Sequence, residues 1–74
     1  MKSGSDIVAA AVQAAGSAGG VDEVRRIAER GPGRMVFSDE DMSILVGEYG
    51  SPHGAMLAIQ YEAMMSVAPV EVQS

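Results

Sequence analysis

The segment from residue 52 to residue 68 carries apolar residues on every side of a predicted helix. It reads Pro-His-Gly-Ala-Met-Leu-Ala-Ile-Gln-Tyr-Glu-Ala-Met-Met-Ser-Val-Ala, and only His53, Gln60, Glu62 and Ser66 interrupt the apolar surface. A helix on the surface of a small globular protein normally has one apolar stripe and one polar face. A chain of 74 residues has few other elements to cover such a helix. We therefore expect another protein chain to cover part of it.

The spacing of apolar residues predicts three further helices before this segment. Over residues 6–15 and 21–30 the apolar positions fall on one helical face, and over 39–49 they recur at i, i+3, i+4 and i+7. Ile44 falls off that last stripe, so it is either an exposed apolar residue or part of a second contact surface. The pattern predicts an all-α fold, a bundle of four short helices in a single domain over residues 1–74.

Capping residues and helix breakers set the expected boundaries. Ser5, Ser38 and Ser51 are suitable N-cap residues, because a serine hydroxyl can accept a hydrogen bond from a free N–H of the first turn. The glycine-rich residues 16–20 are expected to separate the first two helices. Residues 34–37 leave open a short extended segment before the third helix, with Phe37 directed into the core.

The end of the chain is predicted to leave the helical bundle. Pro69 closes the last helix, and residues 69–74 form an extended tail in which Val70 and Val72 alternate with polar residues. Such a tail can add a strand to the edge of a partner's sheet. A frayed terminus is the other interpretation, and the commoner one.

Size and composition favour association with a second chain. A domain of this length buries only about 60–65% of the surface that its unfolded chain exposes, so its core is marginal. The chain has no cysteines, which excludes disulfides and thiolate metal sites. It has one histidine, His53, which argues against a zinc site, because such sites use several ligands. We expect no cofactor and no metal. Oligomerisation is the remaining way for a small domain to gain stability.

Charge argues against nucleic acid as a direct partner. The chain carries ten acidic and five basic residues, a net charge of −5. Its basic cluster is interleaved with acidic residues, as expected of a solvated helix face with ion pairs; the residues are Arg25, Arg26, Arg30 and Arg34 among Asp22, Glu23 and Glu29. The last two helices have the spacing of a helix-turn-helix, but no Arg or Lys follows Pro52, so we do not expect DNA recognition.

The chain shows no pattern of a membrane protein or of a classical secreted protein. Residues 1–6 do not resemble the start of a signal peptide, and the apolar run over 7–12 is short and rich in alanine. The weakly polar stretch over 54–68 falls short of the ~20 residues that a membrane span needs. We expect no membrane partner and a location in the cytoplasm or within a particle.

No motif for catalysis is present, so we expect no enzymatic activity. Residues 39–41 are three consecutive carboxylates, but they lack the spacing of a calcium loop and are expected to line a helix N-terminus. His53 lies next to Ser51 in sequence, without a Gly-x-Ser-x-Gly motif. An enzyme would need a site shared between subunits, with His53 at the seam.

The leading functional hypothesis is a structural or interaction protein. It would be a small helical subunit that self-associates or docks onto a larger protein assembly, with a viral particle as one possible setting. Methionines suit adaptable binding surfaces as well as irregular cores, and both interpretations stay open here. The predicted partner-binding residues are apolar and lie mostly in the last helix and the tail: Ile44, Met56, Ile59, Met64, Met65, Val70 and Val72.

The alternative hypothesis is an acidic inhibitor or adaptor of the kind found in mobile elements. Such a protein would bind a basic surface of a partner protein through complementary charge. The predicted residues are all acidic: Asp39, Glu40, Asp41, Glu48 and Glu62. Salt would weaken this binding steeply and would barely affect association through an apolar helix.

Overall fold

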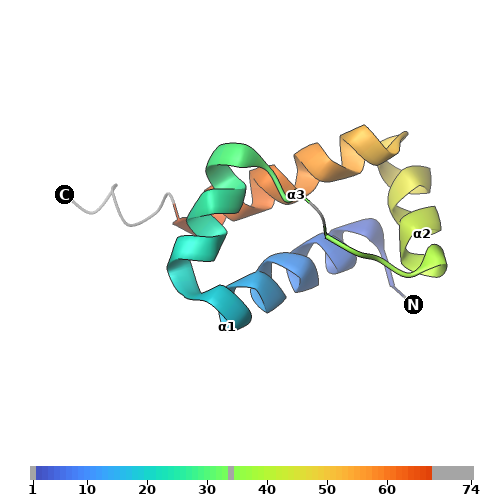
Figure 1. Cartoon of the computed structure of the whole chain (residues 1–74). Helices are drawn as coiled ribbons and strands as arrows, with labels where there is room; N and C mark the ends of the chain where they lie inside the picture. The colour runs from blue at the N-terminus through green and yellow to red at the C-terminus, as the bar shows by residue number, and fades with distance from the viewer. Residues whose placement is uncertain (1, 34, 68–74) are drawn as a thin grey trace.

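The computed structural model describes residues 2–33 and 35–67, which form three helices (Figure 1). These are α1 (Gly4–Arg30), α2 (Asp39–Tyr49) and α3 (Pro52–Val67). No strand occurs among these residues, so the predicted all-α class is confirmed. The predicted four helices are not confirmed, and neither is an extended segment at 34–37. The predicted tail at 69–74 lies outside the described residues.

The first two predicted helices form one helix with a kink. Helical structure continues through the glycine-rich residues, and only Gly20 departs from it, with φ 73° and ψ −169°. Glycine adopts positive φ without the steric cost that a Cβ imposes. The predicted break over residues 16–20 is therefore reduced to one residue. Figure 1 shows the two parts of α1 running in different directions; we call residues 4–19 the first arm and residues 21–30 the second arm.

The start of α1 differs from the prediction. Ser3 is the N-cap, not Ser5: its Oγ accepts a hydrogen bond from the Asp6 N–H at 3.2 Å, and the Asp6 carboxylate accepts one from the Ser3 N–H at 3.3 Å. This reciprocal arrangement is a capping box. The N–H of Gly4 donates to Oε1 of Glu48 at 2.8 Å, so α2 satisfies another free donor of α1.

The boundaries of α2 and the start of α3 follow the predicted capping residues. Ser38 is the N-cap of α2, where its Oγ accepts from the Asp41 N–H at 3.1 Å. Gly50 ends α2 in the left-handed conformation with φ 89°. The hydroxyl of Ser51 accepts from the Gly54 N–H at 3.0 Å, which satisfies a donor in the first turn of α3.

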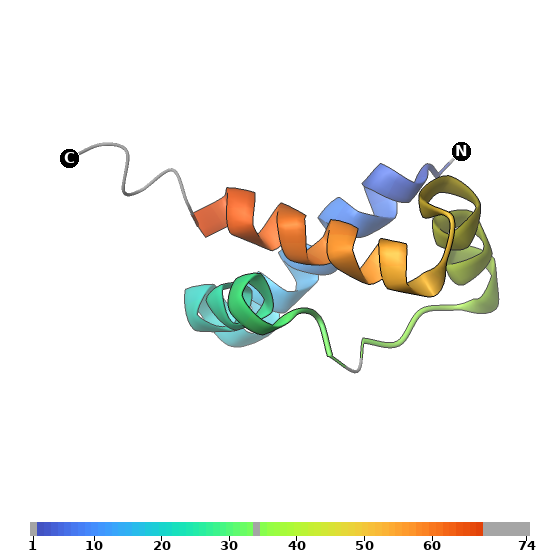
Figure 2. The same ribbon diagram turned by 90° about the horizontal axis from the view of Figure 1, so that it is seen from above.

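The core lies where α3 crosses both arms of α1, with α2 at one end (Figures 1 and 2). Each helix places one large side chain in it with no exposed surface: Ile27, Leu45 and Ile59. Burying a side chain of this size stabilises the fold by about 1.5–3 kcal/mol. The remaining buried apolar residues are Ile7, Val8, Val12, Val24, Ala55 and Ala63, and Phe37 packs against them half-buried.

Candidate partner-binding surface

Helix α3 has one fully buried side and one exposed apolar side. Ala55, Ile59 and Ala63 follow each other at intervals of four residues and have no exposed surface. At 3.6 residues per turn, the exposed apolar residues of the same helix lie mostly on the opposite side. We call these residues the outer stripe: Leu57, Tyr61, Met64 and Met65, with exposed fractions of 52%, 62%, 46% and 53%.

The outer stripe is continuous and uncharged. Its members are spaced at i, i+4, i+7 and i+8, so successive side chains are neighbours along the helix surface. Four large side chains that are each about half exposed present on the order of 400 Å² of surface, a size at which an apolar patch on a small protein is often functional. The arrangement is suited to packing against an apolar surface of another molecule.

The structure divides the predicted partner-binding residues between the surface and the core. Met64 and Met65 are exposed on the outer stripe. Ile44 and Met56 are half-buried and pack against the core. Ile59 is corrected to the core, because it lies on the side of α3 that packs against α1 and has no exposed surface. Val70 and Val72 lie outside the described residues.

Leu57 and Tyr61 were not selected from the sequence, although they are the N-terminal half of the outer stripe. A helix that is apolar on every side gives no periodic signal for which side packs inward, so its exposed residues were ambiguous. The available signal was their spacing of four and then three residues to Met64. This spacing defines one side of a helix, directly opposite the small residues Ala55 and Ala63.

The predicted acidic residues do not act as one free surface. Asp39 and Glu40 are exposed in the first turn of α2. Asp41, in contrast, forms an ion pair with Nζ of Lys2 at 3.0 Å, and this hydrogen-bonded pair raises the pKa of Lys2. Glu48 accepts the hydrogen bond from Gly4 at the start of α1. Glu62 lies on α3, and burial together with the charges of Glu48 and Glu62 raises the pKa of Tyr49, so Glu62 lies near the C-terminal end of α2.

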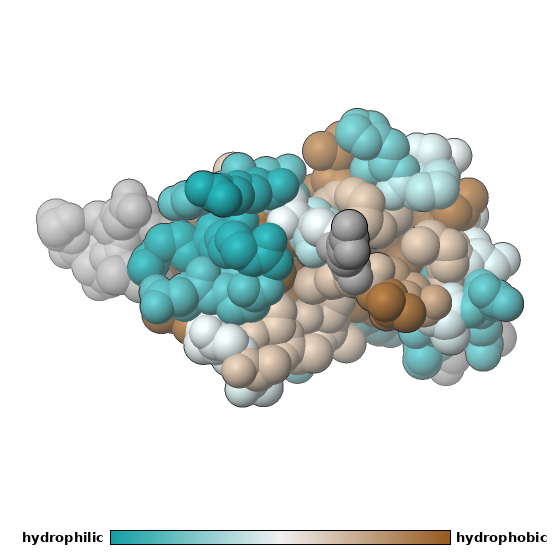
Figure 3. All heavy atoms as spheres, in the orientation of Figure 1, coloured by the Kyte–Doolittle hydropathy of each residue, from teal (hydrophilic) through white to brown (hydrophobic). Residues whose placement is uncertain are grey.

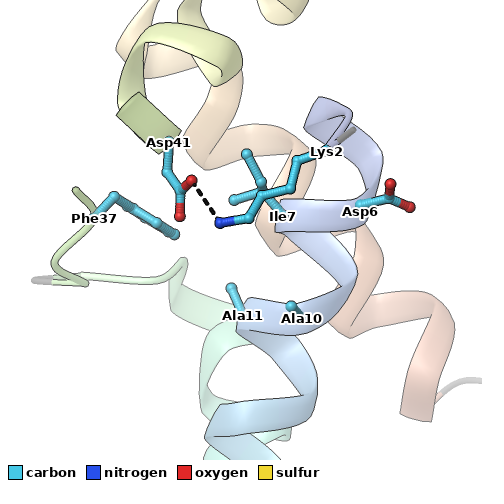
Figure 4. A pocket seen from close by; sticks show the side chains of 7 residues that line it. All are labelled: Lys2, Asp6, Ile7, Ala10, Ala11, Phe37 and Asp41. Atoms are coloured by element: carbon cyan, nitrogen blue, oxygen red, sulfur yellow. Dashed lines mark hydrogen bonds and ion pairs between the residues drawn. The ribbon is translucent and has the colours of Figure 1, made fainter. Parts of the chain in front are cut away.

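A shallow apolar groove runs along the first arm of α1. It consists of two adjoining hollows that share Ala11 and Phe37, and we call it the α1 groove. One hollow has a volume of about 410 Å³ and is lined by Lys2, Asp6, Ile7, Ala10, Ala11, Phe37 and Asp41 (Figure 4). The other has about 340 Å³ and is lined by Ala11, Ala14, Ala15, Glu23, Met35, Val36 and Phe37.

The two arms of α1 present different surfaces. Figure 3 shows hydrophilic residues gathered over the second arm, whereas weakly to strongly hydrophobic residues cover the first arm and the segment that precedes α2. On the second arm, Glu23 pairs with Arg26, and Asp22 lies 3.6 Å from Arg25. These ion pairs agree with the solvated helix face that the sequence predicts for the basic cluster.

The described residues contain no arrangement that indicates metal chemistry or a membrane span. Within 2–33 and 35–67, no three His, Cys, Asp or Glu side chains are grouped so that they could hold a metal ion. No helix in this part of the chain is both long and apolar enough to cross a bilayer. His53 is exposed on α3, and the neighbouring Ser51 hydroxyl accepts a helix N–H.

We compared the chain with known protein families, curated proteins and solved structures. No protein-family model, curated protein or solved structure matches the chain. The functional proposal therefore depends on the surfaces described above.

Proposed function

We propose that this chain is a non-catalytic structural or interaction protein that uses α3 to self-associate or to dock onto a larger protein assembly. The observation that supports the proposal is the outer stripe. Its four large apolar side chains lie side by side, carry no charge, and are each about half exposed. A neighbouring chain that covered them would remove this apolar surface from water, which favours association by about 25 cal/mol per Å² before the costs of binding.

Within residues 2–33 and 35–67, the outer stripe contributes no buried side chain to the core. The opposite side of α3 already supplies the contacts with the core, through Ala55, Ile59 and Ala63. Polar residues at the exposed positions would serve the isolated fold as well. The stripe includes Tyr61, and tyrosine is enriched at interfaces because it combines a large apolar ring with a polar hydroxyl. Methionine adapts to irregular partner surfaces.

The acidic-inhibitor alternative has narrower support. Asp39 and Glu40 are the exposed carboxylates at the start of α2, in a chain with a net charge of −5. Asp41 and Glu48, which the same hypothesis requires, already have partners within the chain. Binding through Asp39 and Glu40 would weaken with salt, so ionic strength separates the two proposals.

Light scattering on a sizing column tests the leading proposal. The wild-type chain, Leu57→Gln/Tyr61→Gln and the control His53→Gln are compared over a wide concentration range at low and high salt. We expect the wild type and the control to rise above the monomer mass of 7.6 kDa independently of salt, and the double variant to stay at it.

A protein that docks only onto a different assembly would be monomeric in this experiment. The dye 8-anilinonaphthalene-1-sulfonate, which binds exposed apolar surface, addresses that case. We then expect the monomeric wild type to bind the dye and the double variant to bind much less. A wild type that is monomeric throughout, with dye binding equal to that of the double variant, would contradict the proposed function.

A further inference from the structure

We infer that Gly20 is a hinge at which α1 straightens, so that two copies of this chain exchange their first arms. Each first arm then packs on the second arm, α2 and α3 of the other copy, through the contacts that it makes within one chain (Figure 1). The surface that receives the exchanged arm is therefore one that the structure already shows in contact with it. The inference does not depend on the outer stripe.

The kink in α1 depends on the backbone of a single residue. Within α1 only Gly20 departs from helical geometry, with φ 73° and ψ −169°, a conformation that is essentially restricted to glycine. The residues on both sides of it are already helical, and none of residues 4–30 is a proline. Rotation at Gly20 alone would therefore make α1 one straight helix, about 40 Å long at 1.5 Å per residue.

Gly20 also divides the chain into two bodies that are joined at this one point. The first arm precedes it, and the second arm, α2 and α3 follow it. The N–H of Gly4 donates to Glu48 at 2.8 Å across the two bodies. Lys2 pairs with Asp41 at 3.0 Å in the same way. Rotation at one residue thus releases the arm as a unit and leaves the interior of each body unchanged.

Opening of the arm within one chain is disfavoured, and exchange removes that cost. Ile7, Val8 and Val12 of the first arm are 5%, 4% and 4% exposed, and all three would face water in an open chain. The first arm of a second copy has the same sequence and fits the vacated site, so reciprocal exchange buries these residues again. The balance between monomer and exchanged dimer then depends on the backbone of Gly20 and on protein concentration.

The residues around the hinge allow two straight helices to pass each other. In an exchanged dimer the two copies of α1 cross near residue 20, where each chain passes from one body to the other. Residues 16–20 are Gly-Ser-Ala-Gly-Gly, and residues 17–20 are exposed. The distance between packed helices depends on the side chains at their contact, and these side chains are small or absent.

Arm exchange differs from association through the outer stripe in two measurable respects. Exchange is reciprocal and two-fold symmetric, so it stops at a dimer. In addition, the first arm and the second arm that contact each other belong to different chains after exchange. A covalent bond between the two arms therefore joins two chains in an exchanged dimer and stays within one chain in every other state.

A disulfide between the two arms provides the test, because the chain has no cysteine of its own. A side chain at residue 16 would begin 3.3 Å from Cγ2 of Val24, so Gly16→Cys/Val24→Cys places the two sulfurs side by side. In a straight helix the same two positions of one chain lie about 12 Å apart and cannot be bridged. A denaturing gel without reductant separates the bridged monomer from the bridged dimer.

The protein with this cysteine pair is the parent, and three substitutions at glycine are added to it. Gly20→Ala disfavours the kink and permits the straight helix. Gly20→D-Ala, made by chemical synthesis, retains the kink, because the mirror image of φ 73° and ψ −169° is an extended conformation that L-residues adopt freely. Gly47→Ala is the matched control, since Gly47 is helical in α2 and an added Cβ has no neighbour within 4 Å.

Each protein is refolded from urea at high concentration, checked by circular dichroism and oxidised. We expect the ratio of bridged dimer to bridged monomer to be at least about tenfold higher in Gly20→Ala than in the parent, because its kinked form is strained. Gly47→Ala should match the parent. Gly20→D-Ala should give bridged monomer only, whereas bridged dimer of the parent should increase with the concentration during refolding.

Two results would overturn the inference. A folded Gly20→Ala protein that forms only bridged monomer shows that the arms do not exchange. If Gly20→Ala does not fold, the parent and Gly20→D-Ala decide the question, and equal amounts of bridged dimer in these two proteins show that Gly20 is not the hinge.

Neither result bears on the proposed function, which depends on the outer stripe. Leu57→Gln/Tyr61→Gln separates the two proposals when it carries the same cysteine pair. This variant should lose the association that the outer stripe provides and should still form the bridged dimer of the parent. A loss of the bridged dimer together with the stripe would contradict exchange as a separate property of α1.

Discussion

The two sides of α3 differ in the size of their apolar side chains, and the larger side chains lie on the exposed side. The buried side consists of Ala55, Ile59 and Ala63, of which two are small. The exposed side carries the larger set, the outer stripe of Leu57, Tyr61, Met64 and Met65. Small residues on the buried side let α1 approach α3 closely, at the cost of a modest buried area. Helix α3 thus makes its contact within the chain through mostly small residues and leaves its larger apolar side chains about half exposed.

The largest expected effect on stability comes from the buried side. Ile59→Ala removes a side chain with no exposed surface and leaves a cavity between α3 and α1, which should lower the free energy of unfolding by about 2–5 kcal/mol. Met64→Ala, on the exposed side, is the control and should change it by less than about 0.5 kcal/mol. Urea denaturation followed by circular dichroism measures both. Equal losses would show that the two sides of α3 are not distinct.

The next effect tests the close approach of α3 to α1. Ala63→Leu adds bulk at a position with no exposed surface, and overpacking of this kind should cost about 1–3 kcal/mol of stability. Ser66→Leu, at an exposed position in the next turn of α3, is the matched control. The same denaturation experiment applies. A stable Ala63→Leu protein would mean that the contact at this position is loose.

The sequence predicts the ends of the helices better than it predicts which faces of the helices are buried. Ser38, Gly50 and Ser51 act locally, and the structure confirms the boundaries that they predict. The capping box of Ser3 and Asp6 is also local, but the apolar pattern over residues 6–15 favours Ser5 as the N-cap, and that prediction is wrong. Capping can be predicted from the sequence because its donors and acceptors are a few residues apart.

The faces of α3 and the path of α1 depend on distant contacts. Apolar residues on every side of α3 make Ile59 and Leu57 equivalent in the sequence, and only the position of α1 decides that Ile59 is buried. Likewise, the glycine-rich segment over residues 16–20 predicts the end of the first helix. Both arms of α1 pack against α3, and only Gly20 departs from helical geometry. The α1 groove combines α1 with residues 35–37, so no local pattern indicates it.

A smaller effect should reach both sides of α3 at once. Ser51→Ala removes the hydroxyl that accepts the Gly54 N–H at the start of the helix and should cost about 1 kcal/mol. Because the buried side and the outer stripe belong to the same helix, association should weaken together with stability. Ser51→Asp, which retains a capping acceptor, should preserve both properties. Thermal unfolding and sedimentation, run on the same samples, measure the two effects.

The smallest effect on stability should come from the outer stripe itself. Leu57→Gln and Tyr61→Gln replace exposed residues with a residue of good helix propensity, so each should change the free energy of unfolding by no more than about 0.5 kcal/mol. Urea denaturation at low protein concentration, where the chain is monomeric, isolates this effect. A loss of several kcal/mol would mean that these side chains belong to the core and that the two sides of α3 do not differ in burial.

The most direct test of the central claim is the mass of the wild type and of Leu57→Gln/Tyr61→Gln, measured by sedimentation equilibrium at increasing concentration. We expect the wild type to associate and the double variant to remain at 7.6 kDa while it unfolds at nearly the same urea concentration. A wild type and a double variant with the same mass at every concentration would contradict the claim that the outer stripe is a surface for self-association.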